Sequence, residues 1–328
     1  MIAPATSAHF LRITTGAWVA LVALLHFSCD RKSGTHAAAG STGNEVKAMD
    51  PPAAPAMSTA EFVQRLRDAI SGSRTQSEVT ARVEKLCANL EKQHLDTLFG
   101  ETSKGPPAGI SSPVWHLGLN QVMEYARTHP GFDAAAPLFR LAANPAAQAV
   151  ARDYACQHYL LAESATLDEL HAAGDLDGWR KHLAEVLDNA ASLVSSATTE
   201  SGTLPGTSLM GLAAIATGFD KYPRELTVIR EKVATLVMPV LEAPANHSVS
   251  TRVSAIQAAA RLQIEKAGPI IAGIALDPKA GIRDRLSAIA SLRYFPSLVS
   301  ISQLETLAGR DKKLALATRS LIEELKRN

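Results

Sequence analysis

A five-residue motif in the C-terminal part of the chain recurs 33 residues later and constrains the fold more than any other feature. Arg252–Ile256 (RVSAI) returns as Arg285–Ile289 (RLSAI). Each copy precedes a second apolar segment, at Ala267 or at Leu298, and Asp311 begins one further unit. Periods of this size are typical of stacked helix pairs. A pair of about 30 residues cannot bury its apolar face alone, so neighbouring pairs must stack on it.

The rest of the chain also follows helical spacing. Aromatic residues make up only 5% of the 328 residues, which argues against a β-sandwich or barrel, and the abundant alanine favours helices. A capping box at Ser58–Glu61 predicts the first helix, and Ser77–Leu98 is expected to form the second. The sequence predicts an all-α protein whose later helices are Pro113–Thr128, Ala134–Ala142, Pro145–Glu163, Leu167–Ala172, Leu176–Ser196, Ser208–Phe219, Arg224–Leu241, Val249–Gln263, Ala267–Ala275, Gly281–Arg293, Ser300–Ala308 and Asp311–Lys326.

One stretch of the repeat carries a family resemblance. Residues 277–292, with Asp277-Pro278, Ile282-Arg283, Arg285-Leu286 and Leu292, resemble a HEAT-like repeat of the bacterial kind related to phycobilin-lyase repeats. Residues 144–155 are similar to a more diverged copy. The resemblance implies an α-solenoid of stacked antiparallel helix pairs, with an irregular helical bundle as the alternative. No His-Glu dipeptide occurs, so the chain does not resemble the di-iron hydroxylases built on such repeats.

The N-terminal segment has the layout of an export signal. Arg12 precedes the apolar run Ala17–Leu25, which is too short to span a bilayer comfortably. Ser28-Cys29 resembles the lipobox of bacterial lipoproteins, although His26-Phe27 departs from its usual pattern. We therefore expect a protein of the bacterial cell envelope that faces the periplasm and is tethered by lipid on Cys29. Ordinary signal cleavage near Ser28 and an uncleaved anchor are the alternatives.

Composition suggests four successive parts. Residues 1–28 are the expected signal peptide, and 29–57 form a linker rich in Pro, Ala, Gly and Ser. Residues 58–104 are expected to form an N-terminal helical pair, and 113–328 the HEAT-like repeat domain. Cys87 and Cys156 lie in amphipathic helical patterns, which favours two free buried thiols over the alternative of a disulfide.

The sequence holds no recognised catalytic, cofactor or metal motif. Its ten histidines make no ligand constellation, and the polar segment Ser201–Ser208 is expected to be a surface connection. The 33 basic and 32 acidic residues are balanced, which does not favour a nucleic-acid partner. We predict no cofactor and no catalytic residue. An alternative enzyme or enzyme-accessory site would use the polar residues Asp168, His171, Asp175 and Asp177.

The expected function is that of a non-catalytic scaffold that binds an envelope protein or peptide. A preformed helical surface provides contact area at little ordering cost. The candidate contact residues are Arg252, Arg283, Arg285 and, if exposed, Trp179. The arginines could instead form ion pairs with Asp277 or Asp284. A purely structural envelope protein is a third hypothesis.

Overall fold

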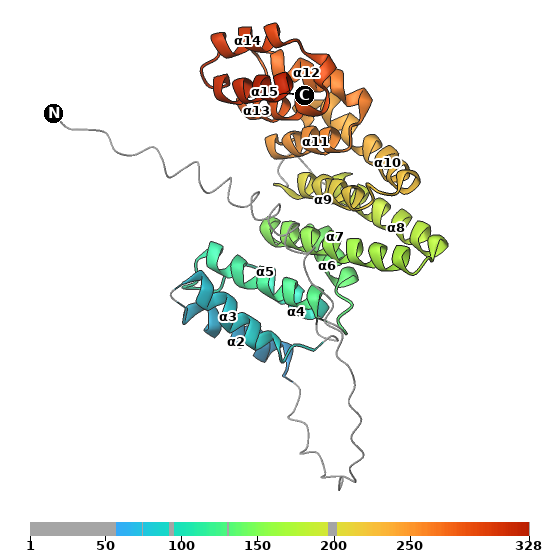
Figure 1. Ribbon diagram of the computed structural model, residues 1–328. Coiled ribbons are helices and arrows are strands. Elements are labelled where there is room, and N and C mark those ends of the chain that lie inside the picture. Colours follow the sequence, from blue (N-terminus) through green and yellow to red (C-terminus); the bar gives the residue numbers. More distant parts are fainter. Residues whose placement is uncertain (1–56, 74, 92–94, 130, 196–201, 328) are drawn as a thin grey trace, which may run out of the picture. The chain divides into compact units, whose positions relative to one another are not determined.

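The computed structural model describes residues 57–73, 75–91, 95–129, 131–195 and 202–327 (Figure 1). These residues belong to one compact unit, which extends over 55–328. Helices and turns account for the described ranges, which contain no β-strand, so the prediction of an all-α protein is confirmed. The predicted signal peptide, Cys29 and nearly all of the predicted linker lie outside the described residues.

The first helices, α2 to α7, include two short ones and end with the longest. Their bounds are α2 Thr59–Ser71, α3 Gln76–Cys87, α4 Leu95–Thr102, α5 Ser112–Thr128, α6 Ala135–Ala143 and α7 Ala149–Ala172. The later α-helices are α8 Leu176–Ser195, α9 Leu204–Gly218, α10 Pro223–Glu242, α11 Val249–Arg261, α12 Gly268–Leu276, α13 Ile282–Ser291, α14 Ile301–Arg310 and α15 Ala315–Arg327. Short 3₁₀ helices are η2 Pro244–Asn246, η3 Glu265–Ala267, η4 Leu292–Tyr294 and η5 Pro296–Leu298.

The predicted capping box of α2 is half formed. The side chain of Ser58 accepts a hydrogen bond from the Glu61 backbone N–H at 3.2 Å. The Glu61 carboxylate pairs with Arg65, one turn further on, at 2.7 Å. By contrast, Ser300 and Gln303 make both reciprocal bonds at the start of α14. Each arrangement satisfies backbone donors that a helix start leaves without an intrahelical acceptor.

Two of the predicted helix boundaries are wrong. The segment Ser77–Leu98 is not one helix, because α3 ends at Cys87 and α4 begins at Leu95. The predicted break between Glu163 and Leu167 is absent, and α7 is continuous through it. The Thr166 hydroxyl in this stretch donates to the Ala162 carbonyl at 3.3 Å, so the polar side chain is satisfied inside the helix.

Three further helix starts differ by four residues from the sequence-based expectation, and one of them is the helix predicted from Asp311, which begins at Ala315. The helix predicted to begin at Pro145 begins at Ala149, and Pro145 lies in the preceding turn. The described part of the polar segment 201–208 is not simply a surface connection, because α9 begins within it at Leu204. Pro205 then occupies the first turn, where its missing N–H costs no helical bond.

Helices pack in consecutive pairs, and the second members of the pairs also contact one another. The contacting pairs are α6 with α7, α8 with α9, α10 with α11, α12 with α13 and α14 with α15. Helices α7, α9, α11, α13 and α15 contact in that order (Figure 1). Earlier in the chain, α3 packs on α5, and α5 packs on α7. The second helix of each pair therefore packs against the second helix of the neighbouring pair as well as against its own partner.

The same type of turn occurs three times. Asn144, Asp277 and Asp311 each accept, through Oδ1, the backbone N–H of the residue two positions further on, at 3.0, 2.8 and 3.0 Å respectively. Such turns suit Asn and Asp because the short side chain replaces a backbone acceptor. Helices α7, α13 and α15 begin a few residues later.

Two of these turns are held by an arginine from the helix that follows. Arg152 donates from Nε to the carbonyl of Ala142 at 2.8 Å, and Arg285 donates from Nε to that of Ala275 at 3.3 Å. In both cases the carbonyl lies ten residues before the arginine. Both arginines are buried, with 8% and 6% of their surface exposed. Each satisfies a carbonyl at the end of the preceding helix, where intrahelical donors are lacking.

Candidate functional site

A cleft of about 340 Å³ lies among α10, η2, α11, α12 and α13. Its apolar wall is formed by aliphatic side chains of three helices, Val240, Leu241, Ile256 and Ile274. Polar residues from α11, α13 and the turn between α12 and α13 complete the lining. This volume falls in the range of pockets that hold small molecules or single side chains.

Arg252 is the cationic group of the cleft, and its guanidinium is held on two sides. Nε and Nη2 lie 3.0 and 2.8 Å from Oδ2 of Asp284. Nη1 donates to the carbonyl of His247 at 2.7 Å and to that of Pro244 at 3.3 Å. Arg252 is therefore neutralised by a carboxylate and tied to the backbone of η2 and of the residue that follows it. It does not present an unpaired positive charge to a ligand.

Asp284 supplies more acceptor capacity than Arg252 uses. It lies in the first turn of α13 and is 7% exposed. Its Oδ1 atom is buried and accepts no hydrogen bond from any described residue. Asp277 lines the cleft as well, with one oxygen engaged by the Lys279 N–H in the turn. The cleft lining thus carries two carboxylates and one guanidinium.

The other two arginines singled out in the sequence have different surroundings. Arg285 is buried, and its Nη1 lies 2.9 Å from Oδ2 of Asp311. Arg283 is exposed and does not line the cleft. Of the alternative ion pairs with Asp277 or Asp284 suggested by the sequence, the structure contains Arg252–Asp284, whereas Arg285 pairs with Asp311 of the next repeat.

Trp179 is 2% exposed and belongs to an aromatic group. Its ring centroid lies 5.2 Å from Phe219 and 6.2 Å from His171, both edge to face. His171 also lies 4.0 Å from the ring of Tyr222, which is 41% exposed. Of this group Tyr222, rather than Trp179, presents a large aromatic surface to solvent.

The residues of the alternative polar site have separate local roles. Asp175 accepts the Gly178 N–H at 2.9 Å and so caps the start of α8. Asp177 pairs with Arg180 at 3.0 Å on the exposed face, and Asp168 is also exposed. Across the described ranges, no group of three or more His, Cys, Asp or Glu side chains is placed to hold a metal ion.

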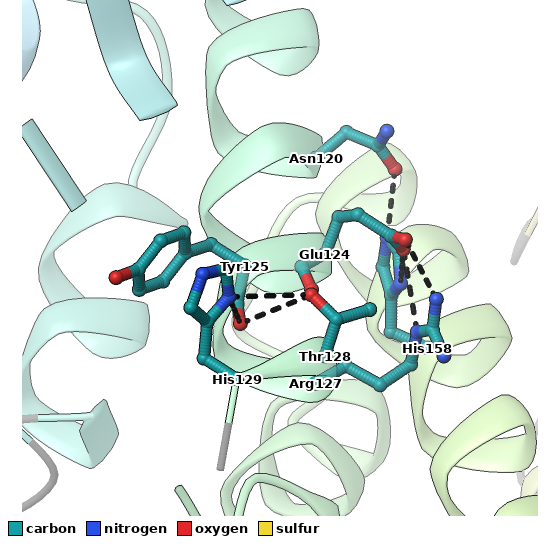
Figure 2. A network of polar contacts seen from close by, with 7 residues as sticks. All are labelled: Asn120, Glu124, Tyr125, Arg127, Thr128, His129 and His158. Carbon is teal, nitrogen blue, oxygen red and sulfur yellow. Dashed lines mark hydrogen bonds and ion pairs between the residues drawn. The ribbon is translucent and has the colours of Figure 1, made fainter. Parts of the chain in front are cut away.

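A polar network joins α5 to α7 (Figure 2). His158 on α7 lies between two groups of α5, with Nε2 3.0 Å from Oδ1 of Asn120 and Nδ1 3.3 Å from Oε2 of Glu124. Arg127 approaches the same carboxylate from one turn further along α5, at 2.6 Å. The approach of Nδ1 to Glu124 is a contact between the two side chains and not a hydrogen bond, since Nδ1 has no hydrogen-bonding partner among the described residues.

Burial and charge act in opposite directions within this network. Contact with His158 and with Arg127 lowers the pKa of Glu124 to about 2, although partial burial opposes the shift. Desolvation is the larger influence on His158 and lowers its pKa, against the raising effect of Glu124. The Glu124 carboxylate is therefore ionised and His158 is neutral near neutral pH.

A second buried acid–base pair joins α7 to α8. Oε2 of Glu163 lies 2.6 Å from Nε2 of His182, and Glu163 is 7% exposed. Burial raises the pKa of Glu163, while His182 acts in the opposite direction. Nearby, Asn189 donates to the hydroxyl of Tyr159 at 3.0 Å. These contacts lie at a helix interface and fasten one helix to the next.

Sequence reasoning did not identify these two networks. Their only local signal is polar residues one turn apart on otherwise apolar faces, Asn120 with Glu124 and Tyr159 with Glu163. The predicted free thiols are confirmed, since Cys87 and Cys156 are both buried and unpaired. Burial, with a smaller effect from Glu84, raises the pKa of Cys87 to about 12.

Comparison with known proteins returned no match to a protein-family model, a curated protein or a solved structure. None of the helices in the described ranges combines the length and the apolar character needed to cross a bilayer.

Proposed function

We propose that the chain is an exported HEAT-like α-solenoid that acts as a non-catalytic protein-binding scaffold in the bacterial cell envelope. The repeated turns support the solenoid. An arginine follows each turn aspartate or asparagine by eight residues, at Arg152, Arg285 and Arg319. The contacts of α7, α9, α11, α13 and α15 in chain order are those that stacked repeats require.

The cleft is the observation that carries the binding role. Its wall combines aliphatic side chains with a carboxylate–guanidinium pair, so apolar area and directional polar contacts occur together. Binding pockets have this composition, because apolar burial supplies affinity and a few fixed polar groups supply specificity. The cleft is built from consecutive helices, so the wall is formed before a partner arrives.

Site-specific photo-crosslinking of the full-length chain in cells tests this role. A photoreactive residue at Ala245, which lines the cleft and is exposed, should capture a discrete envelope protein. The matched control is the same residue at Gly309, an exposed position of α14 with open space around it. Equal labelling from both positions, or none from Ala245, would contradict a binding role for the cleft.

The proposed tether rests on Ser28-Cys29 behind the apolar run Ala17–Leu25. Lipid on Cys29 would hold the helices at the envelope membrane, while residues 29–57 provide a spacer. Metabolic labelling with a fatty-acid analogue should mark the wild-type chain and not Cys29→Ser. Labelling of both chains, or of neither, would contradict lipidation at Cys29.

A further inference from the structure

We propose that the cleft among α10, η2, α11, α12 and α13 binds a basic side chain, arginine or lysine, of a partner polypeptide. The inference rests on the proposed scaffold function and specifies the ligand that its cleft recognises. It starts from the imbalance of charge in the cleft lining, where Asp277 and Asp284 face a single guanidinium from Arg252.

The arrangement of Arg252 argues against an anionic ligand. Its guanidinium already contacts Oδ2 of Asp284 and two backbone carbonyls. An incoming carboxylate or phosphate would have to displace these contacts and would meet two carboxylates at the same site. Like charges brought together in a partly desolvated cleft repel one another.

A second observation, separate from the charge count, is that one oxygen of Asp284 lacks a hydrogen-bond donor among the described residues. Its side chain is only 10% exposed, and Oδ1 receives no hydrogen bond from the described residues. A carboxylate oxygen in such surroundings is stabilised by a charged N–H donor, and basic side chains supply several. Asp277 lies on the same lining and adds a second negative charge, so a cation entering the cleft is attracted by both carboxylates.

The apolar wall favours a basic side chain over a bare inorganic cation. Ile256, Ile274 and Val240 line the cleft beside the charged residues. Arginine and lysine place an aliphatic stem along apolar surface while the charged head reaches a polar partner. The stem would contact the aliphatic wall, and the charged head would lie beside the carboxylates of Asp284 and Asp277 that line the cleft.

The test uses the full-length protein and a panel of blocked five-residue peptides. The central residue is arginine, its neutral analogue citrulline, or glutamate, with leucine on both sides. The arginine peptide should bind about tenfold more tightly than the citrulline peptide, or better, as expected for a charge-assisted hydrogen bond. Asp284→Asn should abolish this preference, and Asp277→Asn should reduce it. Asp311→Asn is the matched control, because it removes the aspartate of a similar arginine pair outside the cleft.

A second variant distinguishes loss of binding from loss of folding. Ala245→Trp fills the cleft from an exposed position while keeping Arg252, Asp277 and Asp284, and should weaken binding of the arginine peptide while leaving the thermal midpoint unchanged. Equal binding of arginine and citrulline peptides, or tighter binding of the glutamate peptide, overturns the assignment. Free arginine amide that binds as tightly as the peptide overturns the polypeptide source. A crosslinked partner at Ala245 without any preference for a basic peptide would refute this inference alone and leave the scaffold function standing.

Discussion

Glu163 on α7 and His182 on α8 are joined by a contact of 2.6 Å between Oε2 and Nε2. The carboxylate is buried and the imidazole is only partly exposed, so water cannot readily replace the lost partner. We expect His182→Ala to lower the free energy of unfolding by about 2 kcal/mol, because it leaves a buried carboxyl without its donor. Arg180→Ala, which breaks an exposed pair with Asp177, should cost less than about 0.5 kcal/mol. Urea unfolding of both variants measures the difference, and equal losses would contradict it.

The neighbouring residues Arg283 and Arg285 should respond very differently to truncation. Arg285→Ala removes a buried donor to the Ala275 carbonyl and leaves Asp311 without its cation, which should cost about 3 kcal/mol. Arg283→Ala removes an exposed side chain and should change stability by less than about 0.5 kcal/mol. Arg285→Lys should rescue little, because lysine lacks the planar fork that reaches both acceptors. Thermal and chemical unfolding of the three variants measures these differences in stability.

Acid should weaken the α5–α7 contact through two groups. The pKa of Glu124 is lowered to about 2 in the folded protein. The ionised carboxylate therefore stabilises the fold at any pH above the ordinary pKa of glutamate, and this contribution disappears as the pH falls toward 2. Because burial lowers the pKa of His158, stability also declines as the pH drops below the ordinary histidine value of about 6.5. Both shifts therefore predict loss of stability on acidification.

Variants separate the two contributions. Glu124→Gln should be less stable than wild type at pH 7 by on the order of 2 kcal/mol, and the difference should shrink as the pH falls below about 4. His158→Asn should remove the part of the acid dependence that begins near pH 6.5. Unfolding free energies between pH 3 and pH 8 provide the measurement. A Glu124→Gln variant with the wild-type acid dependence would show that the network does not carry the effect.

Gly206 lies where α9 approaches α11 closely, and Gly273 on α12 provides a contrasting position with open space. A Cβ at Gly206 would lie 2.6 Å from Oγ of Ser254 and 3.3 Å from the Ser250 carbonyl, so Gly206→Ala should destabilise the protein by about 1–3 kcal/mol. At Gly273, in the middle of α12, nothing lies within 4 Å of such an atom. Gly273→Ala should therefore stabilise by about 0.5–1 kcal/mol through helix propensity. Opposite signs in the two melting shifts are expected, and a stabilising Gly206→Ala would contradict the close approach.

Most of the helical content follows from local pattern. The spacing of apolar residues predicts α5, α8 and α10 to within one residue at each end. The wrong boundaries are of two kinds: a missed break between Cys87 and Leu95, and a predicted break inside α7 that is absent. In α7, the Thr166 hydroxyl donates to the Ala162 carbonyl one turn earlier, so the helix can continue through this polar residue. The spacing of apolar residues gives no sign of such a hydrogen bond.

The ion-pair partners of the arginines could not be predicted from local pattern. Residues close together in the chain were enough to predict an all-α protein and to show that Arg252–Ile256 recurs as Arg285–Ile289. The packing of the helices in space determines that Arg252 meets Asp284 while Arg285 meets Asp311. It also determines that the first pair lines a cleft, with one oxygen of Asp284 accepting no hydrogen bond from the described residues. Those contacts join residues 32 and 26 positions apart. They depend on how neighbouring helices stack about 10 Å apart, where a shift of a few ångströms exchanges one partner for another.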